Sequence, residues 1–303
     1  MFLYQIFQLS ITAPFECPEL LEGDAQSAFF PKITVRYGKV PDHLEAPLNA
    51  GPIFEATNDM FLLKIQEVGN YLIRNGNEII IDPLPDVPEQ ELRLFLLGSA
   101  IGALMNQRGY LLIHASAIAT PKGAILFTGP SGVGKSTTIQ GFIERGYQKM
   151  SDDAIALYYD ESSKKVMILP SYPNAKLWQK SADILGKNTD NLPRIRPTFD
   201  KFYLSTKEYF CNTPLELAAV YQIVPTRLAV DIELEEVNSM EKLQILFRNV
   251  YRKVYAENLH HKQNHFTIGT LAAKQSIIKR IKRSDCKNSL ALLLDTLEAD
   301  FSA

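Results

Sequence analysis

Cysteine is scarce in this sequence, and the few present follow no pattern that builds a metal site or a disulfide framework. Cys17, Cys211 and Cys286 lie far apart, with no Cys-x-x-Cys pair. Dense, regularly spaced cysteines are typical of small secreted domains. Their scarcity therefore predicts reduced, structural thiols in an intracellular protein.

Strong net charge and long apolar runs are also missing. The sequence has 32 Lys and Arg against 34 Asp and Glu, a net charge of −2. No overall field therefore draws it to nucleic acid or to a membrane surface. No apolar run reaches the roughly 18 residues of a membrane span. The opening MFLYQIFQLSITAPFE has no basic start and alternates like a strand, so we expect no signal peptide. These features predict a soluble cytoplasmic protein without nucleic-acid or membrane partners.

Apolar residues are plentiful, at 46% of 303, which suffices for two domains or one large one. Up to about residue 85, short alternating runs separated by Pro, Gly, Asn and Asp predict strands, and RNGNE predicts a hairpin. Residues 88–109 change to helical periodicity and end at a glycine. We expect a β-rich domain at residues 1–85, which could serve substrate recognition, and an α/β domain at residues 86–303.

The second domain begins with two apolar strands that turn at about residues 121–122. A helix is expected from Lys135 to Arg145, stopped by a glycine. Five prolines make residues 170–215 irregular, and PLELAAVYQIVP (214–225) reads as a core strand. Asn238–Glu241 could form a capping box that opens a helix, and the rest of the chain reads as helical.

One motif indicates nucleotide binding. GPSGVGKS (129–136) matches G-x-x-x-x-G-K-[ST], with an apolar strand before it and a helix after it. Glycines let backbone N–H groups converge on phosphate oxygens, and the start of the helix adds its positive end. Lys135 would serve the β- and γ-phosphates, and Ser136 could bind Mg²⁺. The expected nucleotide-binding residues are Gly129, Ser131, Gly132, Val133, Gly134, Lys135, Ser136 and Thr137.

Two adjacent carboxylates follow the helix, at Asp152 and Asp153. The short strand before them should run parallel to the strand that precedes the phosphate loop, so both carboxylates should emerge beside the γ-phosphate. One could help to hold Mg²⁺ while the other accepts a proton from an attacking hydroxyl. The alternative is that one of them caps a turn or pairs with Lys149.

Histidines offer one further candidate. With the turn at residues 121–122, His114 falls opposite Gly129 and beside the nucleotide, although a structural role would explain it equally well. HHKQNH (260–265) has no acidic or cysteine partner, so we expect a solvated helix or loop there and no metal.

The segment from 113 to 157 resembles the core of HPr kinase/phosphorylase, a bacterial P-loop enzyme that phosphorylates a protein serine. The shared pattern is a histidine, the phosphate loop, a helix, a glycine and then Asp-Asp. The fold of that family resembles the nucleotide-binding part of phosphoenolpyruvate carboxykinase. The resemblance implies that Asp152 is the general base, that Asp153 assists the metal with Ser136, and that His114 lies near the base.

The resemblance does not extend to the glycine- and arginine-rich signature of that enzyme, so it does not imply phosphorylase activity, HPr as substrate or a hexamer. Four other stretches resemble a group of stand-alone HPr-kinase-like proteins. Some of these phosphorylate a serine of a ribosomally made precursor peptide, including lasso-peptide precursors. The four stretches are FEATNDMFLLKI (54–65), LFLLGSAIGALMNQRG (94–109), SYPNAKLW (171–178) and PLELAAVYQIV (214–224).

Two basic stretches remain. One is a proline-bounded loop that contains Arg194, Arg196 and Lys201. These side chains could place positive charge at the transferring phosphoryl group, or they could be exposed to solvent without a catalytic role. KQSIIKRIKR (274–283) is predicted to form the basic face of a helix. We expect this face to be exposed to solvent, and docking of an acidic peptide is the less favoured alternative.

Together these features predict an α/β P-loop kinase core behind a β-rich N-terminal domain. We expect it to use ATP and Mg²⁺ to phosphorylate a serine of a peptide or protein, with Asp152, His114, Lys135, Arg196 and Lys201 as catalytic residues. A kinase of a small-molecule alcohol remains open, as does a nucleotide-dependent switch or binding protein without acceptor chemistry.

Overall fold

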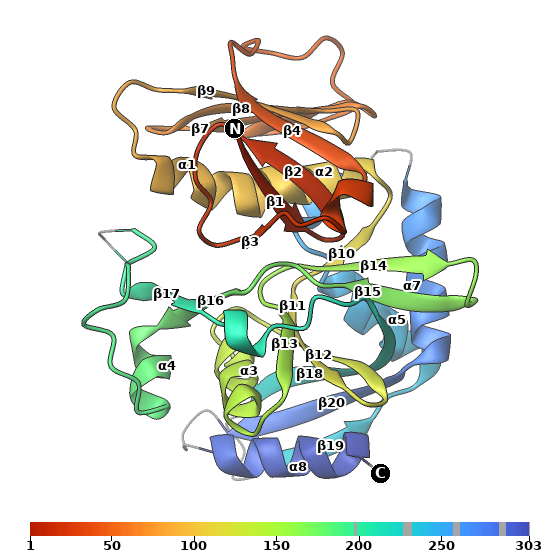
Figure 1. Ribbon diagram of the computed structural model, residues 1–303. Coiled ribbons are helices and arrows are strands. Elements are labelled where there is room, and N and C mark those ends of the chain that lie inside the picture. The colour runs from red at the N-terminus through yellow and green to blue at the C-terminus, as the bar shows by residue number, and fades with distance from the viewer. Residues whose placement is uncertain (197–198, 227–231, 257–260, 285–288, 303) are drawn as a thin grey trace. The chain divides into compact units, whose positions relative to one another are not determined.

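The computed structural model divides the chain into two compact units (Figure 1). Unit 1 comprises residues 1–112 and 251–267, and unit 2 comprises residues 113–250 and 268–303. Within the described ranges no helix combines the length and apolarity needed to cross a membrane. The expectation for Cys286 lies outside the described residues, which are 1–196, 199–226, 232–256, 261–284 and 289–302.

Unit 1 is built on a nine-stranded sheet in the order β3-β1-β2-β4-β9-β8-β7-β6-β5. The β2–β4 and β4–β9 pairs are parallel. The RNGNE hairpin is confirmed, because Asn75 and Gly76 both take positive φ between β8 and β9. The strands are β1 (Phe2–Ile6), β2 (Leu9–Ala13), β3 (Leu21–Glu22), β4 (Lys32–Tyr37), β5 (Asn49–Gly51), β6 (Phe54–Ala56), β7 (Met60–Ile65), β8 (Gly69–Arg74) and β9 (Glu78–Pro83).

A bipartite helix belongs to this unit as well. α1 (Glu89–Phe95) and α2 (Ile101–Gln107) are joined by a π-helical turn at Leu96–Ala100. The hydroxyl of Tyr71 on β8 donates to the carbonyl oxygen of Leu92 on α1, at 3.1 Å. The boundary expected at residue 85 therefore falls inside unit 1, because the helix joins the strands that precede it. The chain returns to unit 1 with α6 (Lys253–Ala256) and the first residues of α7 (Lys262–Gln275).

The centre of unit 2 is a sheet with the order β13-β11-β12-β18-β20-β19. The parallel pairs are β12–β18 and β18–β20, and the β14–β15 hairpin pairs with the start of β18. The strands are β11 (Ala115–Thr120), β12 (Gly123–Thr128), β13 (Gln148–Ser151), β14 (Ile155–Asp160), β15 (Lys165–Leu169), β18 (Leu215–Thr226), β19 (Ile232–Glu236) and β20 (Ile277–Ser284), with β10 (Leu111–Ile113) at the passage between the units.

The direction of these strands gathers the candidate site at one edge of the sheet. β11 runs antiparallel to both β12 and β13, so β12 and β13 point the same way, as the sequence predicted. The pairing of Ala115 with Thr128 confirms the expected hairpin turn at residues 121–122. The end of β12, the end of β13 and the start of β11 therefore lie at the same edge.

The region from 170 to 215 is less irregular than expected. It contains β16 (Asn174–Trp178) and β17 (Lys201–Ser205), which pair antiparallel, and α4 (Gln179–Ile184) between them. Pro173 directly precedes β16 and Pro193 lies between α4 and β17, so these prolines flank the elements without preventing them. Pairing between residues distant in sequence stabilises both strands. The capping box at Asn238 is confirmed and opens α5 (Ser239–Arg248).

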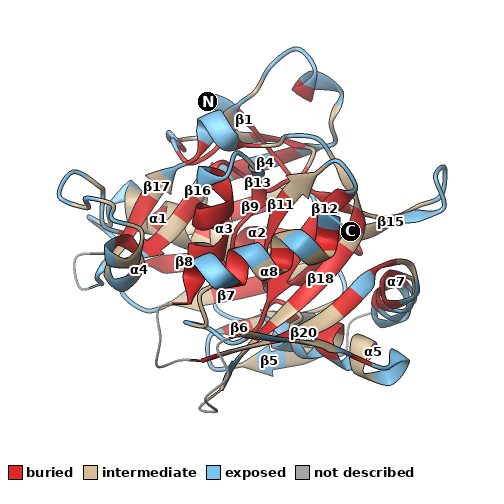
Figure 2. Cartoon of the chain, turned by 90° about the horizontal axis from the view of Figure 1, so that it is seen from below, coloured by how far each residue is buried: buried red, intermediate tan, exposed pale blue. Residues whose placement is uncertain are grey.

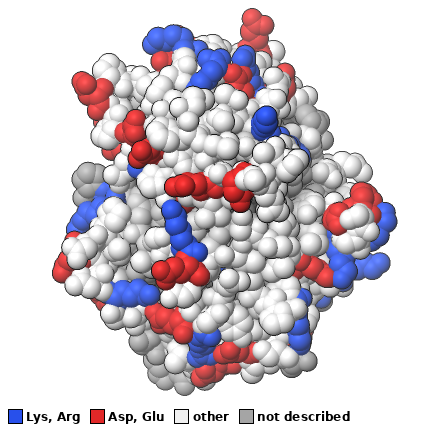
Figure 3. Space-filling view, in the orientation of Figure 1, with Lys and Arg blue, Asp and Glu red and all other residues white. Residues whose placement is uncertain are grey.

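The basic stretch at 274–283 was predicted as a helix face, and this is wrong. Most of it is strand β20, whose buried residues Ile278, Ile281 and Ser284 recur at intervals of three and imitate helical periodicity. Lys279, Arg280 and Lys282 form ion pairs with acidic side chains, most of them on β19, with Lys279 Nζ 2.7 Å from Glu236 Oε1. Arg283 donates from Nε to the hydroxyl of Ser289 instead. Figure 3 likewise shows cationic and anionic residues interspersed on the face it presents.

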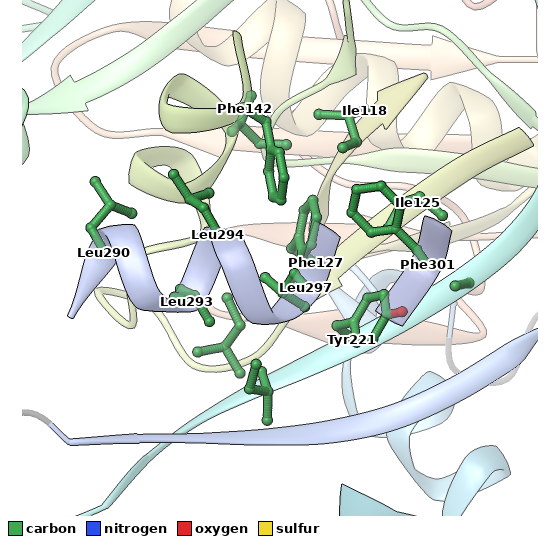
Figure 4. Close-up of a cluster of buried hydrophobic side chains, with 14 of the residues drawn as sticks. Ile118, Ile125, Phe127, Phe142, Tyr221, Leu290, Leu293, Leu294, Leu297 and Phe301 are labelled. Carbon is green, nitrogen blue, oxygen red and sulfur yellow. The ribbon is translucent and has the colours of Figure 1, made fainter. Parts of the chain in front are cut away.

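The main core of unit 2 lies between the sheet and two helices, α3 (Lys135–Glu144) and α8 (Leu290–Ser302). Figure 4 shows Phe127, Phe142 and Phe301 converging there, with ring centroids 5.4 Å apart for Phe127–Phe142 and 5.7 Å apart for Phe142–Phe301. α8 buries one side and exposes the other (Figure 2). This packing fixes α3, and with it the phosphate loop, on the sheet.

The core predicts a stability difference between two leucines of one helix. Leu297 is fully buried, whereas Leu292 is 45% exposed. Leu297→Ala should lower the free energy of unfolding by about 2–5 kcal/mol, because it removes buried methyl groups and leaves a cavity. The control Leu292→Ala should change it by less than about 0.5 kcal/mol. Urea unfolding followed by circular dichroism measures both, and equal losses would contradict the packing described.

Candidate active site

The phosphate-loop motif forms a turn whose three glycines all take positive φ, a conformation that other residues adopt only with strain. β12 ends at Thr128, α3 begins at Lys135, and Gly129, Gly132 and Gly134 between them take φ values of 139°, 82° and 102°. A Cβ added to Gly129 would lie 2.3 Å from the carbonyl oxygen of Ile223 on β18. The glycine spacing therefore follows from backbone geometry and close packing on the next strand.

Lys135 points back over this loop. Its side chain is buried, and its ammonium donates to the carbonyl oxygens of Gly129, at 2.8 Å, and Pro130, at 3.0 Å. Burial lowers the pKa of Lys135, and the nearby Asp152 and Asp153 partly oppose this. A cation held beside backbone N–H groups at the start of a helix is suited to binding phosphate.

Asp152 connects the loop to the rest of the edge. Its Oδ1 accepts hydrogen bonds from the hydroxyls of Ser116, at 2.7 Å, and Ser136, at 3.0 Å. Its Oδ2 accepts from the backbone N–H of Lys176, at 3.4 Å. Asp152 is 7% exposed, so these bonds hold an almost completely buried carboxylate.

Asp153 faces a different set of groups and is about one-third exposed. Its Oδ2 lies 3.1 Å from Lys176 Nζ, and its Oδ1 lies 3.3 Å from His114 Nδ1. The same Nδ1 lies 2.9 Å from the backbone oxygen of Asp153. Because both oxygens are acceptors, Nδ1 carries a proton. Burial alone would raise the pKa of Asp153, but the charge of Lys176 and the hydrogen bond from His114 bring that pKa well below its usual range.

These groups surround one cavity of about 100 Å³ in unit 2. Phosphate loop, carboxylate pair and His114 thus meet in one place, as the sequence predicted. The lining residues are His114, Ser131, Gly132, Gly134, Lys135, Ser136, Thr137, Asp152, Asp153, Lys176, Trp178, Ser181 and Lys201.

The expected basic residues separate in the structure. Lys201 lines the cavity, whereas Arg196 is not among the lining residues. Arg194 forms an ion pair with Asp200, with Nη1 2.8 Å from Oδ1, and its guanidinium lies over Phe202. Lys201 is therefore the residue of this basic loop that reaches the site.

Lys201 lies against the single tryptophan of the sequence. Its ammonium lies 4.9 Å from the centroid of the Trp178 ring. Burial lowers the pKa of Lys201, and the like charge of Lys176 lowers it further. Since Trp178 is 45% exposed and lines the cavity, its fluorescence should respond to a ligand bound there.

Sequence reasoning missed four contributors. One is Ser181 on α4, whose hydroxyl accepts from that of Thr137 at 2.9 Å, and the others are Ser116, Lys176 and Trp178. Lys176 and Trp178 lie in a stretch expected to be irregular, and only the pairing of β16 with β17 directs them to the cavity. Ser116 lies on β11, two residues after His114, so the hairpin register offered a signal for it. No sequence spacing marks the other three.

The residues present fit a magnesium ion that is bound mainly through a nucleotide. In the described part of the chain, no group of three or more His, Cys, Asp or Glu side chains could hold a metal. The hydroxyl of Ser136 and the carboxylate of Asp152 are oxygen donors 3.0 Å apart at the start of α3. Mg²⁺ commonly uses one or two carboxylates together with water and substrate phosphates.

Comparisons with known proteins add one finding. No family model matches the chain, and no curated protein matches it. Among solved structures, the HPr(Ser) kinase/phosphatase from Coxiella burnetii is similar at 15% sequence identity and a TM-score of 0.32, over 62% of this chain and 94% of that chain. A likeness at this level does not show an activity.

The low pKa of Asp153 predicts an acid-dependent loss of stability. A carboxylate whose pKa is depressed by folding stabilises the protein above its unfolded pKa of about 4, and this contribution disappears as the pH falls below that value. Asp153→Asn should therefore lower the melting temperature at pH 7, and the gap from the native protein should narrow toward pH 3. Lys176→Met should produce the same narrowing. A gap that stays constant or widens in acid would contradict this ion pair.

Proposed function

We propose that this protein is a kinase that uses Mg²⁺ and ATP to transfer the γ-phosphate to a serine hydroxyl of a peptide or protein. The observation that carries the proposal is the convergence on one cavity of a phosphate loop, a hydroxyl–carboxylate pair suited to a metal, and a second, more exposed carboxylate. A protein that only binds or hydrolyses the nucleotide would need no second carboxylate to receive the proton of an acceptor hydroxyl.

The contacts favour a division of roles opposite to the one implied by the resemblance. Ser136 is the residue of the motif that binds Mg²⁺, and its hydroxyl contacts Asp152, not Asp153. Asp152 is also almost fully buried, so an incoming acceptor would reach it poorly. We therefore assign Asp152 to the metal, where Mg²⁺ would neutralise charge on the β- and γ-phosphates.

Asp153 is then the base. Its side chain is exposed enough to meet an acceptor hydroxyl, and Lys176 and His114 hold it in one orientation. In the transfer, the acceptor oxygen bonds to the γ-phosphorus, the bond from that phosphorus to the ADP oxygen breaks, and the hydroxyl proton passes to Asp153. A low pKa keeps Asp153 ionised, so it can accept the proton once the acceptor oxygen bonds to phosphorus and its hydroxyl becomes acidic.

Two cations complete the proposed arrangement. Lys135 would turn from its own loop toward the β- and γ-phosphates. Lys201 would leave the face of Trp178 for the transferred phosphoryl group, because a charge-assisted hydrogen bond to phosphate is stronger than a cation–π contact at an exposed site. Arg196 is not part of this proposal, since it does not line the cavity.

The acceptor class is tested by incubating the protein with labelled ATP and cell extract. A second incubation with ribosomally made precursor peptides tests whether the acceptor belongs to that narrower class. Label in a serine of a peptide or protein is the expected result. Label in a small metabolite would instead show a kinase of a small-molecule alcohol. Label that appears only as free phosphate would contradict the proposed function.

Lys135→Ala should lower phosphoryl transfer by at least about 10²-fold, because it removes a cation aimed at charge that develops in the transition state. The change should also weaken the response of Trp178 fluorescence to Mg·ATP. The matched control is Lys122→Ala, which removes an exposed lysine bonded to the carbonyl oxygen of Ser302 and should leave both readouts unchanged. Full activity of Lys135→Ala would contradict the assignment of the phosphate loop.

Replacing each aspartate with asparagine should reduce the activity in a different way. Asp153→Asn should lower turnover by about 10²–10⁴-fold with little change in Mg·ATP affinity, because it removes the proton acceptor. Asp152→Asn should weaken the hold on Mg²⁺, so rising magnesium should recover part of its activity. A titration of magnesium against rate, with nucleotide affinity measured separately, distinguishes them. If high magnesium rescues only Asp153→Asn, the roles implied by the resemblance are correct, with Asp152 as the base and Asp153 at the metal. If both variants keep near-normal rates, the two aspartates have only a structural role.

A further inference from the structure

Behind the cavity lies a lysine that the proposed function does not use. Lys149 is on β13, three residues before Asp152, and its side chain is 0% exposed. Its ammonium donates to the carbonyl oxygens of Tyr172, at 3.1 Å, and Asn174, at 2.5 Å. Among the described residues, no carboxylate lies within ion-pair distance of it, so the salt bridge to Asp152 or Asp153 that the sequence left open is not formed.

Burying this charge is unfavourable for the fold. Burial lowers the pKa of Lys149 to about 8, although Asp152 partly opposes the shift. An apolar side chain of similar length would fill the space without this penalty. What the ammonium provides, and an apolar side chain would not, is the pair of hydrogen bonds to the main chain of one segment.

That segment leads directly to the site. Asn174 begins β16, and Lys176 follows two residues later, so the two side chains leave the same face of the strand. Lys176 is the residue that contacts both carboxylates, with its N–H on Asp152 and its ammonium on Asp153. A displacement of the backbone at Asn174 would therefore reach both carboxylates through Lys176.

A second link from β13 holds the start of the same segment. The hydroxyl of Ser151 lies 2.8 Å from that of Ser171, and the N–H of Ser171 donates to the carbonyl oxygen of Met150, at 3.0 Å. These bonds hold residue 171, whereas Lys149 holds residues 172 and 174. The stretch between them contains Pro173, which has no N–H to donate, so it depends on contacts to its carbonyl groups.

We propose that Lys149 is a positioning residue, which holds the backbone of residues 172–174 so that Lys176 reaches Asp152 and Asp153 together. Lys149 does not touch the cavity and acts only through Lys176. The catalytic part of this inference rests on the proposed function, whereas the structural part, the anchoring of the segment, does not.

The anchoring is tested by hydrogen exchange in the full chain, without any acceptor. In Lys149→Met, the amides of residues 172 and 174–176 should exchange at least about tenfold faster than in the native protein, while those of β18 stay unchanged. In Lys149→Gln, whose side chain can still donate to one carbonyl, these amides should exchange at rates between those of the native protein and of Lys149→Met. Unchanged exchange at residues 172 and 174–176 in a folded Lys149→Met variant would overturn the proposal, whether or not the protein proves to be a kinase.

The catalytic part is tested by a double-mutant cycle on steady-state phosphoryl transfer. Lys149→Met should lower kcat about tenfold or more with little change in KM for Mg·ATP, the size expected when a supporting partner is lost. In a Lys176→Met background the same change should have almost no further effect, whereas in a Lys201→Met background it should keep its full effect.

The outcomes separate positioning from general stability. Equal losses in the Lys176→Met and Lys201→Met backgrounds would overturn the proposal, because they would show that Lys149 does not act through Lys176. If Lys149→Met fails to fold, Lys149→Gln enters the same cycle, with folding checked by circular dichroism. If the native protein transfers phosphate to no acceptor, the proposed function fails, and the exchange measurement still decides whether Lys149 anchors the segment.

Discussion

The buried carboxylate of Asp152 is the interaction on which the candidate site depends. Its two oxygens accept hydrogen bonds from Ser116 on β11, Ser136 on α3 and the main chain of Lys176 on β16. Three elements from separate parts of the chain therefore meet at one point. An unpaired buried carboxylate would be strongly unfavourable, so the loop, the hairpin and the β16 segment must keep these partners in place.

Charge is arranged in alternation around this point. Lys135, Lys176 and Lys201 line the same cavity as the two aspartates, and burial lowers the pKa values of Lys135 and Lys201. The like charge of Lys176 lowers the pKa of Lys201 further, whereas the two carboxylates oppose the effect of burial on both lysines. With three lysines against two aspartates in its lining, the cavity favours the entry of an anionic group.

The tertiary structure also explains why the segment from 171 to 178 matters more than its sequence suggests. It is short and contains a proline, and in the described part of the chain its strand β16 pairs with β17 alone, yet it brings Lys176 and Trp178 to the cavity. Its position is maintained from β13, through Ser151 and the buried ammonium of Lys149. The strand that presents the carboxylates therefore also positions the lysine that orients them.

The sequence by itself determined the features that depend on local geometry. The phosphate loop, the β11–β12 hairpin and its register, and the placement of His114 and both aspartates at one edge all follow from glycine spacing, strand periodicity and the handedness of strand–helix–strand units. Only the tertiary structure decided the rest. Burial at every third residue of β20 imitates helical periodicity. The helix before residue 112 belongs to unit 1 because it contacts β8. Lys176, Ser116 and Lys149 each contact residues that are distant in the chain. Such contacts depend on packing between elements, which no local pattern specifies.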